Sequence, residues 1–490
     1  MKKLAVPAAV ILGLAGAACA TEASADDLMV TKAPPAAAVK APAACTSFED
    51  FISTTCPLTW NGITVYGTID AGVTWQSHGT PFNGTAVTGE EYLLQKNSNR
   101  ALLGLAPNAL SQSNIGIKGN EPFAPGWAFI FDLQAGFDPY SLQLANGPGS
   151  VAQNAGVPLT IQNSNADSSR AGQFYNSLGY LGVSSPYGTV TVFRQNALTM
   201  DGVLAYDPMG GSYAFSPIGW QGITCGAGDT EDCRFSTSVK YHLDIGHFRV
   251  AALWQFGGYS ANNAATNSYQ LQVGGDIVNL AGGTLSLDAI GSQVQNAVAV
   301  TLAGNTLPAV LPQVLTATLS NDTSLMLLAR YSNGPVRLFA GYEYIQYAPP
   351  SSPFAAGTGF NDISGNFVCA GCAAINNTNI NNTALSAGDK PFNIFWTGVK
   401  YTVMPDLDLI GAYYHYYQPT YGAFVDCAVA APAATCHGTF DAVSFAVDWQ
   451  FAKKFDAYAG FMYSQVNGGL ANGYLNHNTI DPTVGLRFRF

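Results

Sequence analysis

The chain has 490 residues, of which only 10% are charged while 12% are aromatic. A typical soluble domain has about 25% charged residues, so this composition argues against a soluble multidomain protein. Beyond the N-terminal segment, no apolar run reaches the about 20 residues that a transmembrane helix needs. A charge-poor, aromatic-rich chain of this kind fits a closed transmembrane β-barrel, in which strand pairing satisfies every backbone polar group.

The N-terminus has the pattern of a secretory signal peptide. Lys2 and Lys3 precede an apolar stretch over residues 4–18, and small-x-small cleavage motifs follow it. We expect cleavage after Ala25, so that residues 1–25 are the signal peptide. Because those residues carry a net charge of +1, removing them changes the net charge from −11 to −12. This acidity argues against nucleic acid as a partner.

The cysteines point to an oxidising compartment. One of the nine cysteines, Cys19, lies in the signal peptide, so eight remain in the mature chain. Cys19 could also be the lipid-modified cysteine of a lipoprotein, but Gly16 stands where a lipobox has leucine, which argues against this alternative. An even number of cysteines in an exported chain indicates disulfides, and their spacing favours four local bridges. A zinc site is the alternative for the third pair, but no second CxxC motif or nearby histidine supports it. The pairs are Cys45 and Cys56, Cys225 and Cys233, Cys369 and Cys372, and Cys427 and Cys436.

An Ala/Pro-rich lead, which we expect in the periplasm, covers residues 26–62. After it, the chain repeats segments of about ten residues in which apolar and polar side chains alternate, the signature of a strand with two different faces. In residues 127–137, for example, apolar side chains occupy one face and Asp132 the other. Sixteen segments show this pattern: residues 63–75, 113–120, 127–137, 173–184, 189–195, 235–243, 247–257, 268–277, 284–295, 322–332, 336–347, 392–401, 407–417, 440–451, 455–466 and 479–490.

The connections alternate between short and long. The short ones carry turn residues, as in residues 185–188 and 333–335, whereas the long ones extend to residues 348–391. A barrel in an outer membrane has this asymmetry, with short periplasmic turns and long extracellular loops. The sequence therefore predicts an all-β fold, a 16-stranded antiparallel transmembrane β-barrel over residues 63–490, placed in the cell outer membrane as a multi-pass protein.

Several stretches resemble the general, trimeric Gram-negative porins, of the alphaproteobacterial kind. Residues 65–73 resemble their first strand, residues 113–133 their second hairpin, and residues 180–195 the hairpin before their constriction loop. Phe490, at the end of the last strand, resembles the sorting signal of outer-membrane barrels. The resemblance implies a homotrimer in outer-membrane lipid and lipopolysaccharide, with a water-filled channel through which small hydrophilic solutes and ions diffuse passively.

The resemblance also implies that the third long loop, residues 196–234, folds into the barrel and narrows it. It assigns Arg194, Asp201 and Asp207 to the pore constriction, with acidic loop residues facing basic wall residues in water, although the loop lacks the acidic-aromatic-Gly-Gly stretch of the enteric members. Either aspartate is also suited to capping a turn. Fixed charges in a narrow pore select among ions whatever the family. Inward-facing strand positions add pore-wall candidates: Lys118, Asp132, Lys240, Arg337, Lys400, Arg487 and Arg489.

Other functions have less support. A substrate-specific uptake channel has the same sequence pattern as a general diffusion channel. An outer-membrane enzyme is the second alternative, but the chain has neither a G-x-S-x-G nor an H-E-x-x-H motif. An adhesin would carry long repetitive passenger segments, which are absent. We therefore expect a channel without catalytic residues, cofactor or metal site.

Overall fold

The computed structural model describes residues 44–78, 101–140, 142, 174–218, 234–256, 266–302, 315–348, 366–367, 375–376, 389–422, 426–429, 432–433, 435–472 and 476–490. All of these belong to one compact unit, residues 32–490. The expected signal peptide lies outside the described residues, as do Cys225, Cys233, Cys369 and Cys372.

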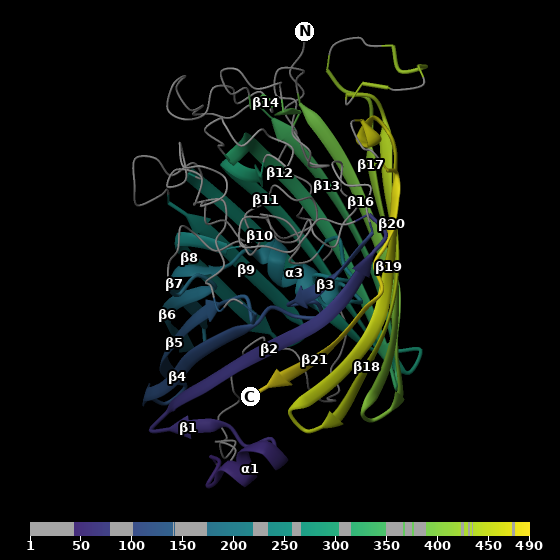
Figure 1. The fold of residues 1–490 in the computed structure, drawn as a ribbon. Coiled ribbons are helices and arrows are strands. Elements are labelled where there is room, and N and C mark those ends of the chain that lie inside the picture. The colour runs from purple at the N-terminus through teal and green to yellow at the C-terminus, as the bar shows by residue number, and fades with distance from the viewer. Residues whose placement is uncertain are drawn as a thin grey trace. The chain divides into compact units, whose positions relative to one another are not determined.

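Sixteen antiparallel strands form a closed β-barrel (Figure 1), as the sequence predicted. Each strand pairs with the next along the wall, and β21 pairs with β2 to close the ring. The wall strands are β2 (Ile63–Gln76), β4 (Asn114–Ala124), β5 (Trp127–Gly136), β6 (Leu178–Ser185), β7 (Gly188–Asn196), β8 (Arg234–Ile245), β9 (Phe248–Gln255), β10 (Thr266–Leu280), β11 (Gly283–Leu302), β12 (Leu315–Asn333), β13 (Val336–Ala348), β16 (Lys390–Met404), β17 (Leu407–Gln418), β18 (Gly438–Ala452), β19 (Phe455–Gly468) and β21 (Thr483–Arg489).

Shorter elements add to this wall. The strands β1 (Leu58–Trp60) and β3 (Leu102–Pro107) both pair with β2, and β20 (Asn478–Ile480) extends the last wall strand along β19. β14 (Asn366–Phe367) and β15 (Ile375–Asn376) form a separate pair. The helices within the described residues are α1 (Phe48–Ser53), α3 (Leu198–Tyr206) and the 3₁₀ turn η3 (Gly469–Ala471).

In the described part of the chain, no helix has the length and apolar character needed to cross a membrane.

The two faces of the wall have different partners. On β12, Leu325 and Leu327 point outward and are 47% and 46% exposed, whereas Met326 and Leu328 point inward and are buried at 0% and 3%. The sequence of this strand is apolar on both faces for that reason: one face forms the exposed outer surface of the wall, and the other packs on a segment inside the barrel. Polar alternation therefore weakens where the lumen is filled by protein.

The wall beside β2 is formed by two consecutive strands, β3 and β4, with a break between them, which the sequence did not indicate. β2 pairs with β3 through residues 71–76 and with β4 through residues 63–68. Between β3 and β4, residues 108–113 leave the wall and turn toward the lumen, beginning at Asn108, whose φ is +60°. We call residues 108–113 the inward segment; Ala109 and Leu110 within it are buried.

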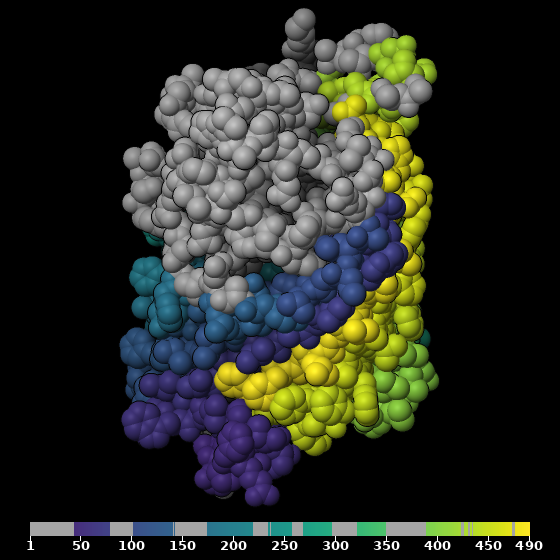
Figure 2. Space-filling model, viewed as in Figure 1, coloured from purple at the N-terminus to yellow at the C-terminus, as the bar shows by residue number. Residues whose placement is uncertain are grey.

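The end of the predicted lead is folded. Ser47 caps α1 by accepting a hydrogen bond from the Asp50 N–H at 3.0 Å, the usual role of serine before a helix. Phe51 of α1 packs against Phe488 and Phe490 at ring-centroid distances of 6.1 and 6.0 Å. Figure 2 shows α1 below the seam where β2, in purple, lies beside the yellow C-terminal strands.

Candidate pore constriction

The connection after β7 folds into the barrel. Its described part, residues 197–218, is called the inner loop here and contains α3. Helix α3 lies against the inner face of β9 to β13. A Cβ on Gly202 would approach Ile290 Cδ1 to 2.7 Å and Leu328 Cδ1 to 2.9 Å, which shows how closely the helix packs on the side chains of the wall. The predicted inward fold of this loop agrees with the structure.

Hydrogen bonds from the wall hold the inner loop along its length. Trp396 Nε1 donates to the Tyr206 carbonyl at 3.1 Å, and the Tyr416 hydroxyl donates to the Pro217 carbonyl at 2.9 Å. Farther along the loop, the Ala214 N–H donates to the carbonyl of Ala109 at 2.9 Å. These contacts come from the neighbouring strands β16 and β17 and from the segment between β3 and β4, so the inner loop is fixed inside the barrel at several points of the wall.

Asp207 was expected to face water, and this expectation is wrong. Its side chain is buried, and its carboxylate accepts hydrogen bonds from the Tyr414 hydroxyl at 2.6 Å, the Gly211 N–H at 2.7 Å and the Met209 N–H at 3.2 Å. Burial raises the pKa of Asp207, although these donors favour its ionised form. Asp207 therefore caps the turn that follows α3 and holds it to β17.

Arg194 was also expected in water, and it too is buried, with 6% of its surface exposed. Its Nε donates to the Asn176 carbonyl at 2.7 Å, and its Nη1 to the Arg234 carbonyl at 3.5 Å. The guanidinium thus ties the upper ends of β7 and β8 to the segment before β6. Because its guanidinium is buried, Arg194 does not present its charge to the lumen.

Asp201 differs from Asp207 because it remains partly exposed. Its carboxylate is 38% exposed and forms a close ion pair with the ammonium group of Lys240 on β8. The Lys240 Nζ also donates to the Asn196 carbonyl at 3.2 Å. The ion pair connects the inner loop to the wall at the point where the loop leaves it, and it compensates the negative charge of the aspartate.

In the described part of the wall, many charged side chains on the inner face form ion pairs with the neighbouring strand or with the strand beyond it. Such pairs compensate each other's charge locally, which weakens their effect on passing ions. Lys400, Arg487 and Arg489, all predicted for the pore wall, belong to this set. The pairs are Arg249 Nε–Asp288 Oδ1 (2.9 Å), Arg249 Nη1–Asp276 Oδ1 (3.2 Å), Lys400 Nζ–Asp408 Oδ2 (2.7 Å), Arg487 Nε–Asp456 Oδ2 (2.8 Å), Arg487 Nη2–Asp448 Oδ2 (3.1 Å) and Arg489 Nη2–Asp456 Oδ1 (2.9 Å).

Two neighbouring arginines have no carboxylate within ion-pair distance in the described ranges. Arg330 on β12 donates from Nη1 to the Ala205 carbonyl at 3.2 Å and lies over the Tyr206 ring, 5.6 Å from its centroid. Arg337 on β13 is exposed, and in the strand register it lies opposite Lys400. The sequence pattern identified Arg337 as inward-facing but did not lead to Arg330. Arg330 alternates in phase with the inward-facing Met326 and Leu328 on β12, so the same pattern could have identified it.

The remaining wall candidates lie together on β4 and β5. Lys118 and Asp132 are register partners, and the Lys118 Nζ lies 4.9 Å from the centroid of the Tyr66 ring. The Tyr66 hydroxyl donates to Asp132 Oδ1 at 2.5 Å and accepts from Gln134 Nε2 at 3.2 Å. These side chains form one polar, aromatic patch on β2, β4 and β5.

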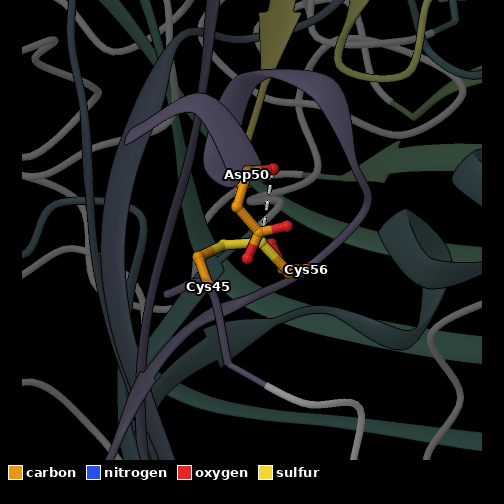
Figure 3. Close-up of side chains that lie close together, drawn as sticks. All are labelled: Cys45, Asp50 and Cys56. Carbon is orange, nitrogen blue, oxygen red and sulfur yellow. Dashed lines mark hydrogen bonds between the residues drawn. A yellow bond between two sulfur atoms is a disulfide. The ribbon is translucent and has the colours of Figure 1, made fainter. Parts of the chain in front are cut away.

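Two of the predicted disulfides are confirmed: Cys45–Cys56 and Cys427–Cys436. Figure 3 shows Asp50 beside the first of them. These three residues are the one group of potential metal ligands among the described residues. A disulfide offers no thiolate to a metal ion, so the group is a covalent closure of the α1 loop.

Comparison with known proteins agrees with this geometry. A family model of Gram-negative porins matches residues 7–469. The chain belongs to the Gram-negative porins. It is an outer-membrane channel protein, and its 16-stranded barrel is the fold that the sequence predicted.

Solved structures show the same fold as this porin. An anion-selective porin from Comamonas acidovorans has a TM-score of 0.54 at 13% identity, covering 87% of this chain and 99% of the other. In vitro folded OmpT of Vibrio cholerae, in its trimer form, has a TM-score of 0.51 at 14% identity, covering 87% and 99%. No curated protein sequence matches the chain.

Proposed function

We propose that this porin is a passive, non-catalytic diffusion channel for small hydrophilic solutes and ions, assembled as a homotrimer and constricted by the inner loop. The main support is that residues 197–218 lie inside the barrel and are fixed by hydrogen bonds to β16, β17 and the inward segment. A fixed obstruction narrows the path for every solute and leaves an opening whose size does not depend on a moving gate. The apolar outer face of the strands is suited to lipid and to further copies of the chain.

We further propose a weak preference for anions. Of the two aspartates on the inner loop, Asp207 is shielded by burial and Asp201 is compensated by Lys240. Arg330 and Arg337 then supply positive charge without a carboxylate partner among the described residues. Selectivity depends on charges within about 8–10 Å of the ion path, so these arginines outweigh the net negative charge of the whole chain.

Planar-bilayer recordings test both parts. The parent should give stable currents that close in three steps, and its reversal potential in a potassium chloride gradient should lie toward that of chloride. Arg330→Gln with Arg337→Gln should move the reversal potential toward cations, because the uncompensated charge is gone. Lys453→Gln is the matched control, since Lys453 is an exposed lysine in the turn between β18 and β19, outside the lumen. It should leave the reversal potential unchanged.

The selectivity proposal fails if the arginine pair can be neutralised without a shift, or if the control shifts equally. The channel proposal fails separately, if folded parent protein in bilayers gives no stepwise conductance.

A further inference from the structure

Asp70 on β2 is a fully buried carboxylate at the closing seam of the barrel. Its Oδ2 accepts hydrogen bonds from the Leu110 N–H at 2.9 Å and the Ser111 N–H at 2.7 Å, and its Oδ1 accepts one from the Tyr458 hydroxyl at 2.5 Å. Hydrogen bonds to an ionised acceptor are stronger than neutral ones, and buried donors are costly to leave unpaired. Asp70 therefore fixes the three groups that donate to it.

The backbone of Asp70 holds the two ends of the inward segment. The Asn108 N–H donates to the Asp70 carbonyl at 3.1 Å, and the Asp70 N–H donates to Ser113 Oγ at 2.9 Å. Within the segment, the Ser113 N–H donates to Asn108 Oδ1 at 2.8 Å. One residue of β2 thus organises the whole excursion between β3 and β4.

The inward segment in turn holds the distal part of the inner loop. The Ala109 carbonyl accepts the hydrogen bond from the Ala214 N–H at 2.9 Å. Both alanines are completely buried and belong to one apolar cluster with Phe215 and Leu110. A hydrogen bond formed in such dry surroundings has no water to replace it, so displacement of the inward segment releases Ala214.

Tyr458 on β19 provides a second connection from Asp70 to the same part of the loop. Its hydroxyl reaches Asp70, and its ring contacts Phe215 edge-on at a centroid distance of 6.3 Å. To do so, it lies across β21 at Gly485, where a Cβ would come within 2.2 Å of the tyrosine hydroxyl. Gly485 is therefore required for this path across the seam.

We propose that Asp70 is a positioning residue for the distal part of the inner loop, residues 212–218, and thereby sets the width of the constriction. It acts through the inward segment and through Tyr458, without contacting the solute. The proposal rests on the proposed function, in which the inner loop forms the constriction. Without Asp70, the loop should move in the lumen and interrupt the current.

The test records single channels of Asp70→Ala, Asp70→Asn and Tyr458→Phe. Asp70→Ala should raise the occupancy of partly closed levels by about tenfold or more, the factor that corresponds to about 1.4 kcal/mol. Asp70→Asn should stay close to the parent, because its amide oxygen accepts from both N–H groups and its amide nitrogen donates to Tyr458. Tyr458→Phe should raise the occupancy of partly closed levels to an intermediate extent. If Asp70→Ala does not fold, Tyr458→Phe tests the positioning role in its place.

Thr74→Val is the matched control. Thr74 lies on the same face of β2, is fully buried, and shares a hydrogen bond with Thr483 across the same seam at 2.7 Å. Its loss weakens the seam but not the inward segment, so closures should stay at the parent level. Closures in Thr74→Val equal to those in Asp70→Ala would overturn the proposal, as would quiet channels in both Asp70→Ala and Tyr458→Phe.

Asp201→Asn separates the two proposals. If Asp201→Asn alters conductance while the Asp70 and Tyr458 variants remain quiet, the inner loop lines the pore and only the positioning role fails. If none of these variants alters conductance, the inner loop is not the constriction and the proposed function fails at that point.

Discussion

Replacing Asp207 should release the turn of the inner loop from the wall. In Asp207→Ala, the N–H groups of Met209 and Gly211 and the hydroxyl of Tyr414 lose their acceptor in a buried site. The barrel strands keep all their pairing, so the cost falls on the docking of the loop. The variant should therefore fold and insert normally but hold the inner loop less firmly.

The size of this effect follows from the number of hydrogen-bond donors that lose their acceptor. Each buried donor without a partner costs about 1–3 kcal/mol, and relaxation recovers part of it, which leaves about 3 kcal/mol. The population with the loop undocked should then rise roughly a hundredfold. Tyr414→Phe removes one hydrogen bond to the carboxylate and should cost about 1.5 kcal/mol, roughly a tenfold rise. In the double variant, loss of the Tyr414 hydroxyl should add almost nothing, because its acceptor is already gone.

Thiol labelling measures that population. Met209 is 4% exposed, so a cysteine placed there by Met209→Cys reacts with a polar thiol reagent only when the turn undocks. Labelling at residue 209 is followed by mass spectrometry of the peptide, in the parent and in each variant background. Asp406→Ala is the control, since it removes an exposed carboxylate from the turn between β16 and β17. Equal labelling rates in the parent and Asp207→Ala would refute the reasoning, as would equal acceleration by Asp406→Ala.

Three further predictions concern the seam and the α1 loop. Deleting Phe490 should lower the yield of folded protein in membrane fractions if it is the sorting signal. Phe51→Ala keeps Phe490 and removes its aromatic contacts with Phe488 and Phe490, so it should cost about 0.5–1.5 kcal/mol of local stability and leave the yield unchanged; an equal loss of yield in both variants would contradict this. Reducing the Cys45–Cys56 disulfide should increase hydrogen exchange in α1 while conductance stays constant, because the bridge lies outside the wall; a changed conductance would contradict this. The hydrogen bond from the Thr46 N–H is the main cause that lowers the pKa of Asp50 in the folded state. The Asp50 carboxylate therefore stabilises α1 fully above its unfolded-state pKa, and this stabilisation is lost as pH falls through its folded-state pKa. Hydrogen exchange in α1 should rise in strong acid, and an unchanged acid response in Asp50→Asn would contradict this.

The alternation of side chains was enough to predict the barrel. Period-2 patterning depends only on neighbouring residues and on the two environments that flank a strand, so all sixteen wall strands could be found, within a few residues at most ends. The same parity placed Lys240, Lys400 and Arg487 on the inner face. Short spacing also sufficed for the Cys45–Cys56 and Cys427–Cys436 disulfides, since closing a small loop restricts the possible partners.

Local signals failed where partners come from distant parts of the chain. Helix α3 has no side-chain cap at Ala197 and is apolar on nearly every side, so neither capping nor periodicity indicated a helix. For α1, by contrast, Ser47 and Asp50 did carry a capping signal that could have been read. Residues 108–113 leave the wall because β2 and the inner loop satisfy their backbone groups, which no local pattern indicates.

The two aspartates of the inner loop show the limit most clearly. By sequence, Asp201 and Asp207 are equivalent acidic residues in one loop. In the fold, Asp207 meets the hydroxyl of Tyr414, 207 positions away, and is buried, whereas Asp201 stays partly exposed beside Lys240. Exposure of a carboxylate is set by what packs over it, and that depends on how the whole ring of strands closes. The sequence by itself determined the barrel and the faces of its strands, and only the tertiary structure decided which charges remain in the lumen.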